Sequence, residues 1–340
     1  MRFIVGCKPG QYPDRSEKVA IVGAGPAGLY AAGYLRCKGF QVTVYDKNPE
    51  PGGLLIFGIL EIHVNKPKVR EGIEELRRLG VEFRQGVEVG RDVSLGELID
   101  SYDAVLIATG TWKTKFLNIP GSNLPGVVGA FEWIIDYHMW KYGYKDQQPP
   151  IAPRVAVIGG GLTAVDAVYV SKWLGAKEIH VIYRRTREYA PAGVRGFKEM
   201  EEQGAVIHEL MSPVEYIAGP GGRVAAVKVQ KMKLVQQPGE KRPRPVPVEG
   251  AFETIEVDMV IEAVGLEPTP PKGVEEYGIR LRKDGTIDVD EYKRTTREPV
   301  FAAGDVEHGP SLIGPAAKSG LDAAKAIEKY LNREIGWRRD

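Results

Sequence analysis

The chain has 340 residues, enough for two domains of ordinary size, with hydrophobic residues at 43% and charged residues at 27%, close to the averages for globular proteins. The net charge of +1 gives no overall attraction to nucleic acid or to an anionic membrane surface, and no stretch is apolar for long enough to cross a bilayer. Two cysteines, Cys7 and Cys37, are too few for a framework of several disulfides or for a cysteine-ligated iron–sulfur cluster within this chain.

Glycine is in clear excess, with 41 residues in 340, well above the roughly 7% of an average protein. The glycines do not gather in low-complexity runs, so they indicate many tight turns and close backbone approaches, as nucleotide cofactors require. The N-terminal segment reaches glycine and charge after a very short apolar run, which is not the pattern of a signal peptide. We therefore expect a cytoplasmic enzyme.

The first third of the chain alternates between strand and helix patterns. Strands are expected at 18–23, 40–46, 81–83 and 102–110, and helices at 26–39 and 68–80. The helix at 26–39 opens on a proline and closes on a glycine, both common at these positions. Apolar strands that alternate with helices predict a parallel sheet with helices on its faces.

The same pattern starts again at Arg154, after an apolar helix at 131–140 and a polar, proline-rich join at 144–153. The expected order is then a strand, a glycine turn and a helix to Gly175, followed by a strand at 178–183, a strand-rich stretch at 206–264 and a final segment with a helix to about residue 331. The chain thus predicts an α/β fold with two Rossmann-like dinucleotide-binding domains. We expect the first domain at 1–118, an inserted second domain at 119–268, and a return to the first domain at 269–340.

The first glycine turn has the spacing of a dinucleotide-binding motif. Gly23, Gly25 and Gly28 follow a strand and open a helix, so a diphosphate would lie on the exposed N–H groups of the helix N-terminus. Asp46 ends the next strand 18 positions after Gly28, close to the ~20 expected for a residue that binds ribose hydroxyls. The alternative, a glycine turn that serves packing alone, fits this context less well.

The second glycine turn differs at the end of the following strand. Gly159, Gly161 and Ala164 repeat the spacing, but Arg184 and Arg185 stand where an acidic ribose reader would be expected. Paired guanidinium groups suit a doubly charged 2′-phosphate better than a neutral hydroxyl. The sequence therefore favours NADPH over NADH at this turn.

Two alternatives concern these arginines: they serve only to solvate the end of a strand, or they pair with Glu188. If they do bind a phosphate, the two turns bind different nucleotides, one with a free ribose and one with a phosphorylated ribose. A flavin and a nicotinamide are the obvious pair, with hydride passing between the two rings and with positioning as the main catalytic contribution.

Six motifs occur in the order seen in flavoproteins with two dinucleotide-binding domains of the glutathione-reductase-like plan. They are VAIVGAGPAGLYAA, PGGLLIFGI, LIATGT, VAVIGGGLTAVDA, VIYRRTREYAPAG and VFAAGD. Over residues 17–331 the set resembles the small (beta) subunit of NADPH-dependent glutamate synthase and its relatives. These relatives include the flavin subunits of ferredoxin-linked NADPH oxidoreductases and of sulfide dehydrogenase.

The resemblance implies two sets of cofactor-binding residues. For FAD they are Gly23, Gly25, Pro26, Ala27, Gly28, Asp46, Gly53, Leu54, Gly58, Ala108, Thr109, Gly110, Gly304, Asp305, Gly314, Pro315 and Ala316. For NADPH they are Gly159, Gly161, Leu162, Thr163, Ala164, Arg184, Arg185, Ala263 and Gly265. No side chain is assigned as catalytic; Gly53, Leu54, Ile59 and His63 are expected in the environment of the flavin.

The chain also departs from this family. The family's N-terminal iron–sulfur domain is missing from this sequence, Leu162 stands where a polar residue is common, and Leu60 replaces the usual proline. The expected function is hydride transfer between NADPH and FAD, with electrons passed to a partner protein or a diffusible acceptor. Open alternatives are a ferredoxin–NADP reductase, a flavin subunit of the sulfide dehydrogenase type, and a subunit that is inactive without its large partner. A homo-oligomer also stays open.

The remaining features point to no further chemistry. Thioredoxin reductases share the plan but need a Cys-x-x-Cys motif, which this chain lacks. The five histidines show no metal-binding spacing, so we expect them to be structural or exposed; they are His63, His138, His180, His208 and His308. A basic stretch at 239–247 is expected to be a solvated hairpin connection, with docking of an acidic electron-transfer partner as the alternative.

Overall fold

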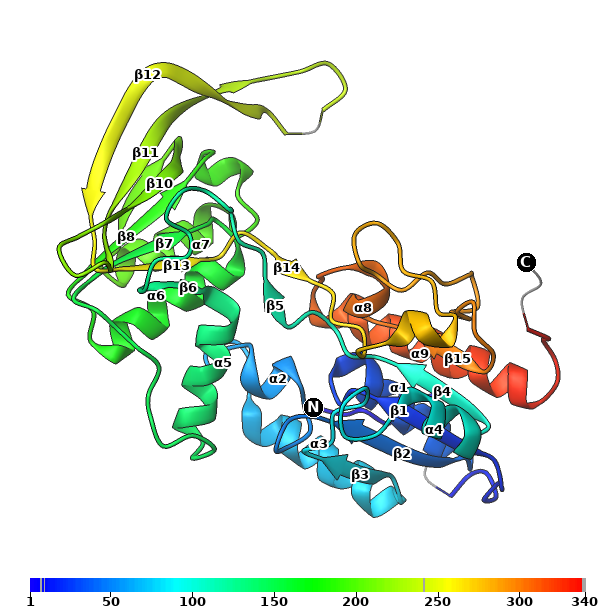
Figure 1. Cartoon of the computed structure of the whole chain (residues 1–340). Helices are drawn as coiled ribbons and strands as arrows, with labels where there is room; N and C mark the ends of the chain where they lie inside the picture. Colours follow the sequence, from blue (N-terminus) through cyan, green and yellow to red (C-terminus); the bar gives the residue numbers. More distant parts are fainter. Residues whose placement is uncertain (7, 9, 241, 338–340) are drawn as a thin grey trace. The chain divides into compact units, whose positions relative to one another are not determined.

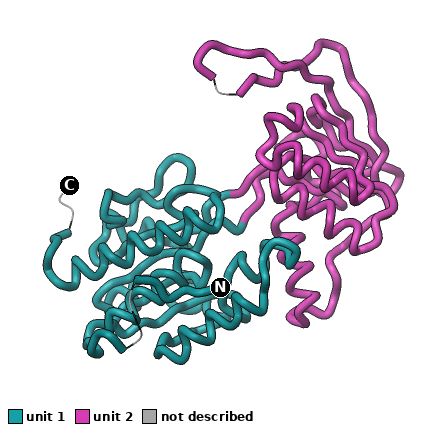
Figure 2. Tube along the Cα trace, turned by 180° about the vertical axis from the view of Figure 1, so that it is seen from behind, with its two compact units in different colours: residues 1–112, 267–340 teal, residues 113–266 magenta. Residues whose placement is uncertain are grey.

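The computed structural model describes residues 1–6, 8, 10–240 and 242–337, and it divides the chain into two units. Unit 1 contains residues 1–112 and 267–340, and unit 2 contains residues 113–266 (Figure 2). The chain thus leaves unit 1 once and returns once. Cys37 is buried, and Cys7 lies outside the described residues.

Unit 1 is built on a five-stranded parallel sheet (Figure 1). Its strands are β1 (Lys18–Val22), β2 (Gln41–Asp46), β3 (Glu82–Gln85), β4 (Ala104–Ile107) and β15 (Val300–Ala302). The order across the sheet is β15-β4-β1-β2-β3, so the order reverses beside β1. In open sheets of this kind, ligands bind at the carboxyl ends of the strands where the order reverses.

Capping residues mark the start of two helices of unit 1, α3 (Lys66–Leu79) and α4 (Leu95–Ser101). The other helices of this unit are α1 (Pro26–Cys37), α2 (Leu54–Phe57), α8 (Asp305–His308), α9 (Ile313–Leu331) and a 3₁₀ turn η2 (Val274–Tyr277). α3 starts two residues before the prediction because Asn65 caps it, accepting from the N–H of Lys68 at 2.9 Å. α4 was not predicted, although Ser94 and Glu97 form a capping box at its start.

Helix α9 returns to unit 1 and packs on the start of α1. A Cβ on Gly320 would come within 2.1 Å of the carbonyl oxygen of Ala27, and a Cβ on Gly304 within 2.8 Å of the Ala27 side chain. Both glycines therefore allow the returning segment to lie directly against the helix that follows the first glycine turn.

Unit 2 repeats the plan of unit 1. Its parallel sheet has the order β6-β13-β7-β8-β9, formed by β6 (Val127–Gly129), β7 (Arg154–Ile158), β8 (Glu178–Tyr183), β9 (Val206–Glu209) and β13 (Met259–Glu262). The helices are α5 (Ala130–Lys141), α6 (Leu162–Leu174), α7 (Gly193–Glu202) and the 3₁₀ turn η1 (Arg187–Tyr189); the short strands β5 (Lys113–Thr114) and β14 (Leu266–Glu267) lie where the chain passes between the units.

A three-stranded antiparallel sheet completes unit 2. It contains β10 (Met211–Ala218), β11 (Val224–Val235) and β12 (Arg244–Glu256). The β11–β12 register shifts between Gln230 and Met232, where residues 248–251 of β12 stand opposite the single residue Lys231 of β11. Bulges of this kind bend a ribbon, and Figure 1 shows the outer part of the hairpin turning away from the inner part.

A buried carboxyl group ties this sheet to the parallel sheet. Glu262, at the end of β13, is fully buried and accepts from the hydroxyl of Tyr216 at 2.5 Å and from the N–H of Leu117 at 2.8 Å. Burial raises the pKa of Glu262. The pair lies in the core of unit 2, directly before the turn at Ala263.

Candidate functional site

The first glycine turn joins β1 to α1, and its three glycines meet different surroundings. Gly23 has a φ of +111°, and a Cβ there would come within 2.3 Å of the Ala108 carbonyl oxygen at the end of β4. A Cβ on Gly28 would come within 1.9 Å of the Gly23 carbonyl oxygen, whereas a Cβ on Gly25 would have no atom within 4 Å. Gly23 and Gly28 are therefore required by packing, and Gly25 leaves open space at the N-terminus of α1.

Asp46 lies at the end of β2 and faces this turn. Its Oδ2 accepts from the N–H of Ala24 at 2.7 Å, and its Oδ1 accepts from the N–H and the side-chain amide of Asn48, both at 2.8 Å. The side chain is buried, which raises the pKa of Asp46. The expected ribose reader thus lies beside the glycine turn, held by three hydrogen bonds.

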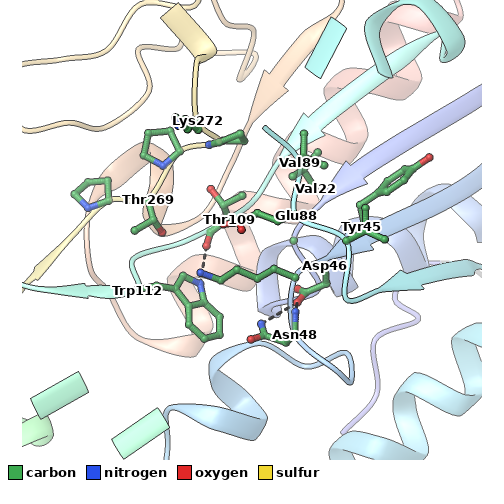
Figure 3. Close-up of a pocket in the computed structure, with 16 residues that line it drawn as sticks. Val22, Tyr45, Asp46, Asn48, Glu88, Val89, Thr109, Trp112, Thr269 and Lys272 are labelled. Carbon is green, nitrogen blue, oxygen red and sulfur yellow. Dashed lines mark hydrogen bonds between the residues drawn. The ribbon is translucent and has the colours of Figure 1, made fainter. Parts of the chain in front are cut away.

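A pocket of about 360 Å³ opens beside Gly23 and Asp46 (Figure 3). Its lining residues all belong to unit 1: Val22, Gly23, Tyr45, Asp46, Lys47, Asn48, Val87, Glu88, Val89, Thr109, Trp112 and 268–272. The ammonium of Lys47 lies 5.0 Å from the centre of the Trp112 ring. Thr109 Oγ1 is buried and has no hydrogen-bond partner among the described residues. The pocket therefore combines the Trp112 ring with the predicted ribose-binding residue Asp46, a lining that fits the adenosine part of a dinucleotide.

The segment from Gly52 to Ile59 is fixed to the first glycine turn. The N–H of Gly52 donates to the Ala24 carbonyl oxygen at 2.9 Å, and a Cβ on Gly53 would come within 2.8 Å of Gly25 Cα. Gly53 has a φ of +53° and caps the short helix α2, which starts at Leu54. The structure thus brings the predicted flavin-side segment against the predicted diphosphate-binding turn.

Lys66, the first residue of α3, contacts this segment, and the sequence patterns did not indicate this role. Its side chain is buried, and its Nζ donates to the carbonyl oxygen of Leu55 at 2.6 Å and to that of Ile59. Lys66 therefore holds α2 and the residues directly after it. Its position at the start of an amphipathic helix is ordinary for a surface lysine, so nothing in the sequence distinguishes it.

The returning segment brings Asp305 and the start of α9 into unit 1. Gly304 has a φ of +76°, and its N–H donates to Ser319 Oγ at 2.9 Å. Asp305 Oδ1 accepts from Ser311 Oγ at 2.7 Å. No side chain caps the first turn of α9, where Pro315 has no N–H and the N–H of Ala316 donates to the Leu312 carbonyl oxygen at 3.3 Å. The N–H of Gly314 is left at the positive helix end for an electron-rich group.

The second glycine turn, between β7 and α6, has the same construction as the first. Gly159 has a φ of +149°, and a Cβ there would come within 2.4 Å of the Ala263 carbonyl oxygen at the end of β13. A Cβ on Gly161 would have no atom within 4 Å, and Ala164 is fully buried. Leu162, the first residue of α6, is 54% exposed. The second turn therefore leaves the same open space at a helix N-terminus.

The arginines after β8 differ in their partners. Arg187 forms ion pairs with Glu201 at 3.0 Å and with Glu209 at 3.2 Å, and these hydrogen-bonded carboxylates raise its pKa. Within the described part of the chain, the guanidinium of Arg184 has no hydrogen-bond or ion-pair partner, and that of Arg185 meets only a carbonyl oxygen. Two of the three positive charges at this strand end are thus not neutralised by carboxylates.

The proposed pairing with Glu188 is not found among these contacts. A hydrogen bond from the Thr186 hydroxyl lowers the pKa of the Glu188 carboxyl, with a smaller contribution from Arg187. The exposed Arg184 and the half-buried Arg185 are therefore available to an anion at the end of β8.

The histidines contribute no metal site in the described ranges, where no three His, Cys, Asp or Glu side chains are grouped suitably. His63 and His308 are exposed. His180 and His208 share a hydrogen bond of 2.9 Å across β8 and β9, and burial lowers the pKa of His208. Sequence spacing could not show this pair, because the two strands are adjacent only in the folded sheet.

Among residues 1–6, 8, 10–240 and 242–337, no helix combines the length and apolar character needed to cross a membrane.

Comparison with known proteins decides the family. The family model described as pyridine nucleotide-disulphide oxidoreductase matches residues 17–320. The chain belongs to this family. Its membership confirms the predicted α/β plan and the predicted enzyme class, a pyridine-nucleotide oxidoreductase.

Relatives within the pyridine nucleotide-disulphide oxidoreductases confirm the predicted subgroup. The chain is 38% identical to the putative glutamate synthase [NADPH] small chain of Cereibacter sphaeroides, over 97% of this chain and 80% of that protein. It is 36% identical to the glutamate synthase [NADPH] small chain of Azospirillum brasilense, over 92% of this chain and 66% of that protein. The chain is therefore of the glutamate synthase small-chain type, and it spans only part of these relatives.

A solved structure of the same fold is FprA of Mycobacterium tuberculosis in complex with NADPH. The TM-score is 0.78 at 22% identity, over 94% of this chain and 85% of that chain. This likeness supports the fold of two dinucleotide-binding domains.

Proposed function

We propose that this chain holds FAD in unit 1 and NADPH in unit 2, and that it transfers hydride between the two cofactors. One observation carries the proposal: two glycine turns of the same construction are followed by different side chains at the end of the next strand. Asp46 follows the first turn, and Arg184 with Arg185 follows the second. A buried carboxylate suits ribose hydroxyls, and unneutralised guanidinium groups suit a 2′-phosphate.

Unit 1 fits FAD in three places. The open space at Gly25 and the N-terminus of α1 would take the diphosphate, and the pocket beside Asp46, Thr109 and Trp112 would take the adenosine. The uncapped start of α9 would face the flavin, where a positive helix end stabilises negative charge on the reduced ring. When bound, FAD supplies the ring that exchanges hydride with the nicotinamide.

Unit 2 fits NADPH at the second turn. The open space at Gly161 would take the diphosphate on the N-terminus of α6, and Arg184 and Arg185 would bind the 2′-phosphate. Among the remaining predicted contacts, Thr163 and Ala164 lie in the first turn of α6, Ala263 lies against Gly159, and Gly265 follows two residues later in the chain. The protein's contribution is to fix the nucleotide in one orientation, because no acid or base is needed for hydride transfer.

The electron acceptor is part of the proposal. The relatives named as glutamate synthase small chains suggest a large partner subunit, and a diffusible acceptor is the other route. A cytoplasmic location belongs to the same proposal.

The test is anaerobic reduction of the FAD-loaded protein by NADPH in a stopped-flow spectrometer. We expect the yellow colour to bleach in a phase whose rate saturates with NADPH. Protein that takes up no FAD, or that stays yellow with NADPH, would refute the proposal. Turnover of an artificial dye by the isolated chain would exclude an inert subunit, and faster reaction of reduced ferredoxin with NADP⁺ would favour the reverse direction.

A further inference from the structure

The outer part of the β11–β12 hairpin reaches the arginine segment after β8. This outer part comprises 232–235 of β11, the connection at 236–243 and the start of β12, with Lys241 outside the described residues. A two-stranded ribbon that extends beyond a core is only marginally stable alone. The bend at the bulge and the contacts described next hold it against residues 185–189.

Four hydrogen bonds link the hairpin to this segment, two of them through Leu210, which follows β9. The N–H of Leu210 donates to the Arg185 carbonyl oxygen at 3.2 Å, and the N–H of Met232 in turn donates to the Leu210 carbonyl oxygen at 2.7 Å. Arg185 Nε donates to the Pro243 carbonyl oxygen at 3.2 Å. The guanidinium of Arg242 donates to the Tyr189 carbonyl oxygen. Three of these bonds fall on residues 185–189, the segment that contains Arg185 and directly follows Arg184, and the fourth connects the hairpin to Leu210.

The contact with Pro243 uses only one nitrogen of Arg185. Nε is occupied by the carbonyl, while the two Nη atoms have no partner among the described residues. Pro243 itself is buried although it lies next to the end of an exposed connection. A guanidinium held through Nε is fixed in its plane and presents its remaining N–H groups in one direction, which suits bidentate binding of a phosphate.

Arg242 adds a further positive charge at the same place. It is exposed, and its one contact in the described chain is to a backbone carbonyl, so its charge is not neutralised there. Arg244, two residues on, differs because it pairs with Glu240 at 2.7 Å. The hairpin therefore carries one guanidinium without a carboxylate partner in the described chain, that of Arg242, and one that is neutralised, that of Arg244.

We propose that this hairpin is part of the nucleotide specificity site: Arg242 binds the 2′-phosphate together with Arg184 and Arg185, and Pro243 orients Arg185. The inference rests on the proposed function, because it assumes that the second turn binds NADPH. It replaces the expectation that the basic stretch at 239–247 is only a solvated connection. The ligand chemistry is a phosphate monoester on the ribose of an adenine nucleotide.

The test measures binding of 2′,5′-ADP, 5′-AMP and inorganic phosphate to the FAD-loaded protein by calorimetry. For Arg242→Ala we expect the Kd of 2′,5′-ADP to rise about tenfold, the size of one charge-assisted contact, with the Kd of 5′-AMP unchanged. Arg244→Ala is the matched control, and it should leave both values as in the wild type. In turnover, Arg242→Ala should raise the KM for NADPH and leave kcat and the KM for NADH unchanged.

Each result separates the inference from the function on which it rests. If Arg242→Ala binds 2′,5′-ADP like the wild type while the double change of Arg184 and Arg185 to Ala does not, the hairpin inference is wrong and the proposed function stands. Equal losses for Arg242→Ala and Arg244→Ala would show general electrostatics and overturn it too. If Arg242→Ala weakened the binding of inorganic phosphate as much as that of 2′,5′-ADP, the site would be an unspecific anion site and the inference would be overturned. Arg242→Gln serves as a second variant if Arg242→Ala fails to retain FAD.

Discussion

The carboxylate of Asp46 accepts a hydrogen bond from the backbone N–H of Ala24, with 2.7 Å between Oδ2 and N. This bond joins the end of β2 to the middle of the first glycine turn, and Oδ1 is held at the same time by Asn48. One buried carboxylate thus fixes the proposed ribose-binding position relative to the proposed diphosphate-binding position. An acidic residue at this place has a structural task in addition to its proposed contact with the ribose.

Asp46→Asn should weaken FAD binding. The amide nitrogen is a donor, so it must oppose either the N–H of Ala24 or the N–H groups of Asn48, and a buried donor is left unsatisfied. We expect the Kd of FAD to rise by about tenfold or more, measured by fluorescence titration of the deflavinated protein. Asp322→Asn, which changes an acid paired with Lys318 on the surface of α9, should bind FAD normally; an equal loss there would contradict the assignment.

The same carboxylate predicts a pH dependence. Burial raises the pKa of Asp46 above its usual 3.8, so protonation begins at a higher pH than for an exposed aspartate. A protonated oxygen no longer accepts well from the N–H groups that hold it. FAD retention should therefore fall as the pH drops through this raised pKa, and the Asp46→Asn protein should lack this step when released FAD is measured against pH.

Gly25→Ala separates cofactor binding from folding. The added Cβ meets no protein atom within 4 Å, so the free energy of unfolding of the FAD-free protein should stay within about 1 kcal/mol of the wild type. The methyl group would occupy the space proposed for the diphosphate, and FAD binding should weaken by about tenfold or more. Titration with FAD and thermal unfolding of the apoprotein measure the two effects.

Gly28→Ala is the matched comparison. Its Cβ would lie within 1.9 Å of the Gly23 carbonyl oxygen, so the turn itself must shift and the apoprotein should unfold more easily. If Gly25→Ala destabilises the apoprotein as much as Gly28→Ala does, the space beside Gly25 is not a ligand site.

Much of this arrangement could be predicted from local patterns. The two glycine turns, the strands that lead into them, and the residues Asp46 and Arg184 at the ends of the next strands follow from period, spacing and strand order. Within each parallel sheet, the glycine turn and the end of the next strand lie at the same edge, because the carboxyl ends of parallel strands are together. Local chemistry therefore suffices for them.

The contacts that join distant segments could not be predicted in this way. Lys66 is buried against the carbonyl groups of Leu55 and Ile59, although its surroundings in the sequence are those of a surface lysine. The connection that contains Arg242 has a basic, proline-rich sequence that is equally compatible with a solvated loop. Its contacts with the arginine segment depend on a bulge in β12 that bends the ribbon. The alternation of apolar and polar residues along a strand does not predict such a bend.

Glu262→Gln should alter stability in a pH-dependent way. Because burial raises the pKa of Glu262 above 4.5, the folded protein keeps its proton to a higher pH than the unfolded chain. The free energy of unfolding therefore falls as the pH rises from about 4.5 to the folded pKa and does not recover above it. Glutamine is neutral throughout and can accept from Leu117 and donate to Tyr216, so the stability of the variant relative to the wild type should rise between pH 4.5 and pH 8.

Urea unfolding at the two pH values measures this gain. Glu256→Gln is the control, because that carboxylate is 79% exposed in its pair with Arg154, and it should gain nothing on the wild type at pH 8. A wild type whose stability does not fall over this range would show that Glu262 is charged in the folded protein.

Changing both Arg184 and Arg185 to Ala should remove the preference for the phosphorylated coenzyme. Neither guanidinium has a carboxylate partner in the described chain, so their loss leaves no buried acid unpaired and should cost little stability. Two charge-assisted contacts to a 2′-phosphate would be lost, and we expect the KM for NADPH to rise by about a hundredfold while the KM for NADH stays unchanged.

Arg187→Ala provides the contrast within the same segment. It removes the partner of Glu201 and Glu209, so its main effect should be a lower unfolding temperature, with the ratio of KM values for NADPH and NADH preserved. Steady-state kinetics with both coenzymes and thermal unfolding of all variants distinguish the two roles. If Arg187→Ala changes the coenzyme preference and the double variant does not, the phosphate is read by the neutralised arginine, and the difference in partners after β8 has been misinterpreted.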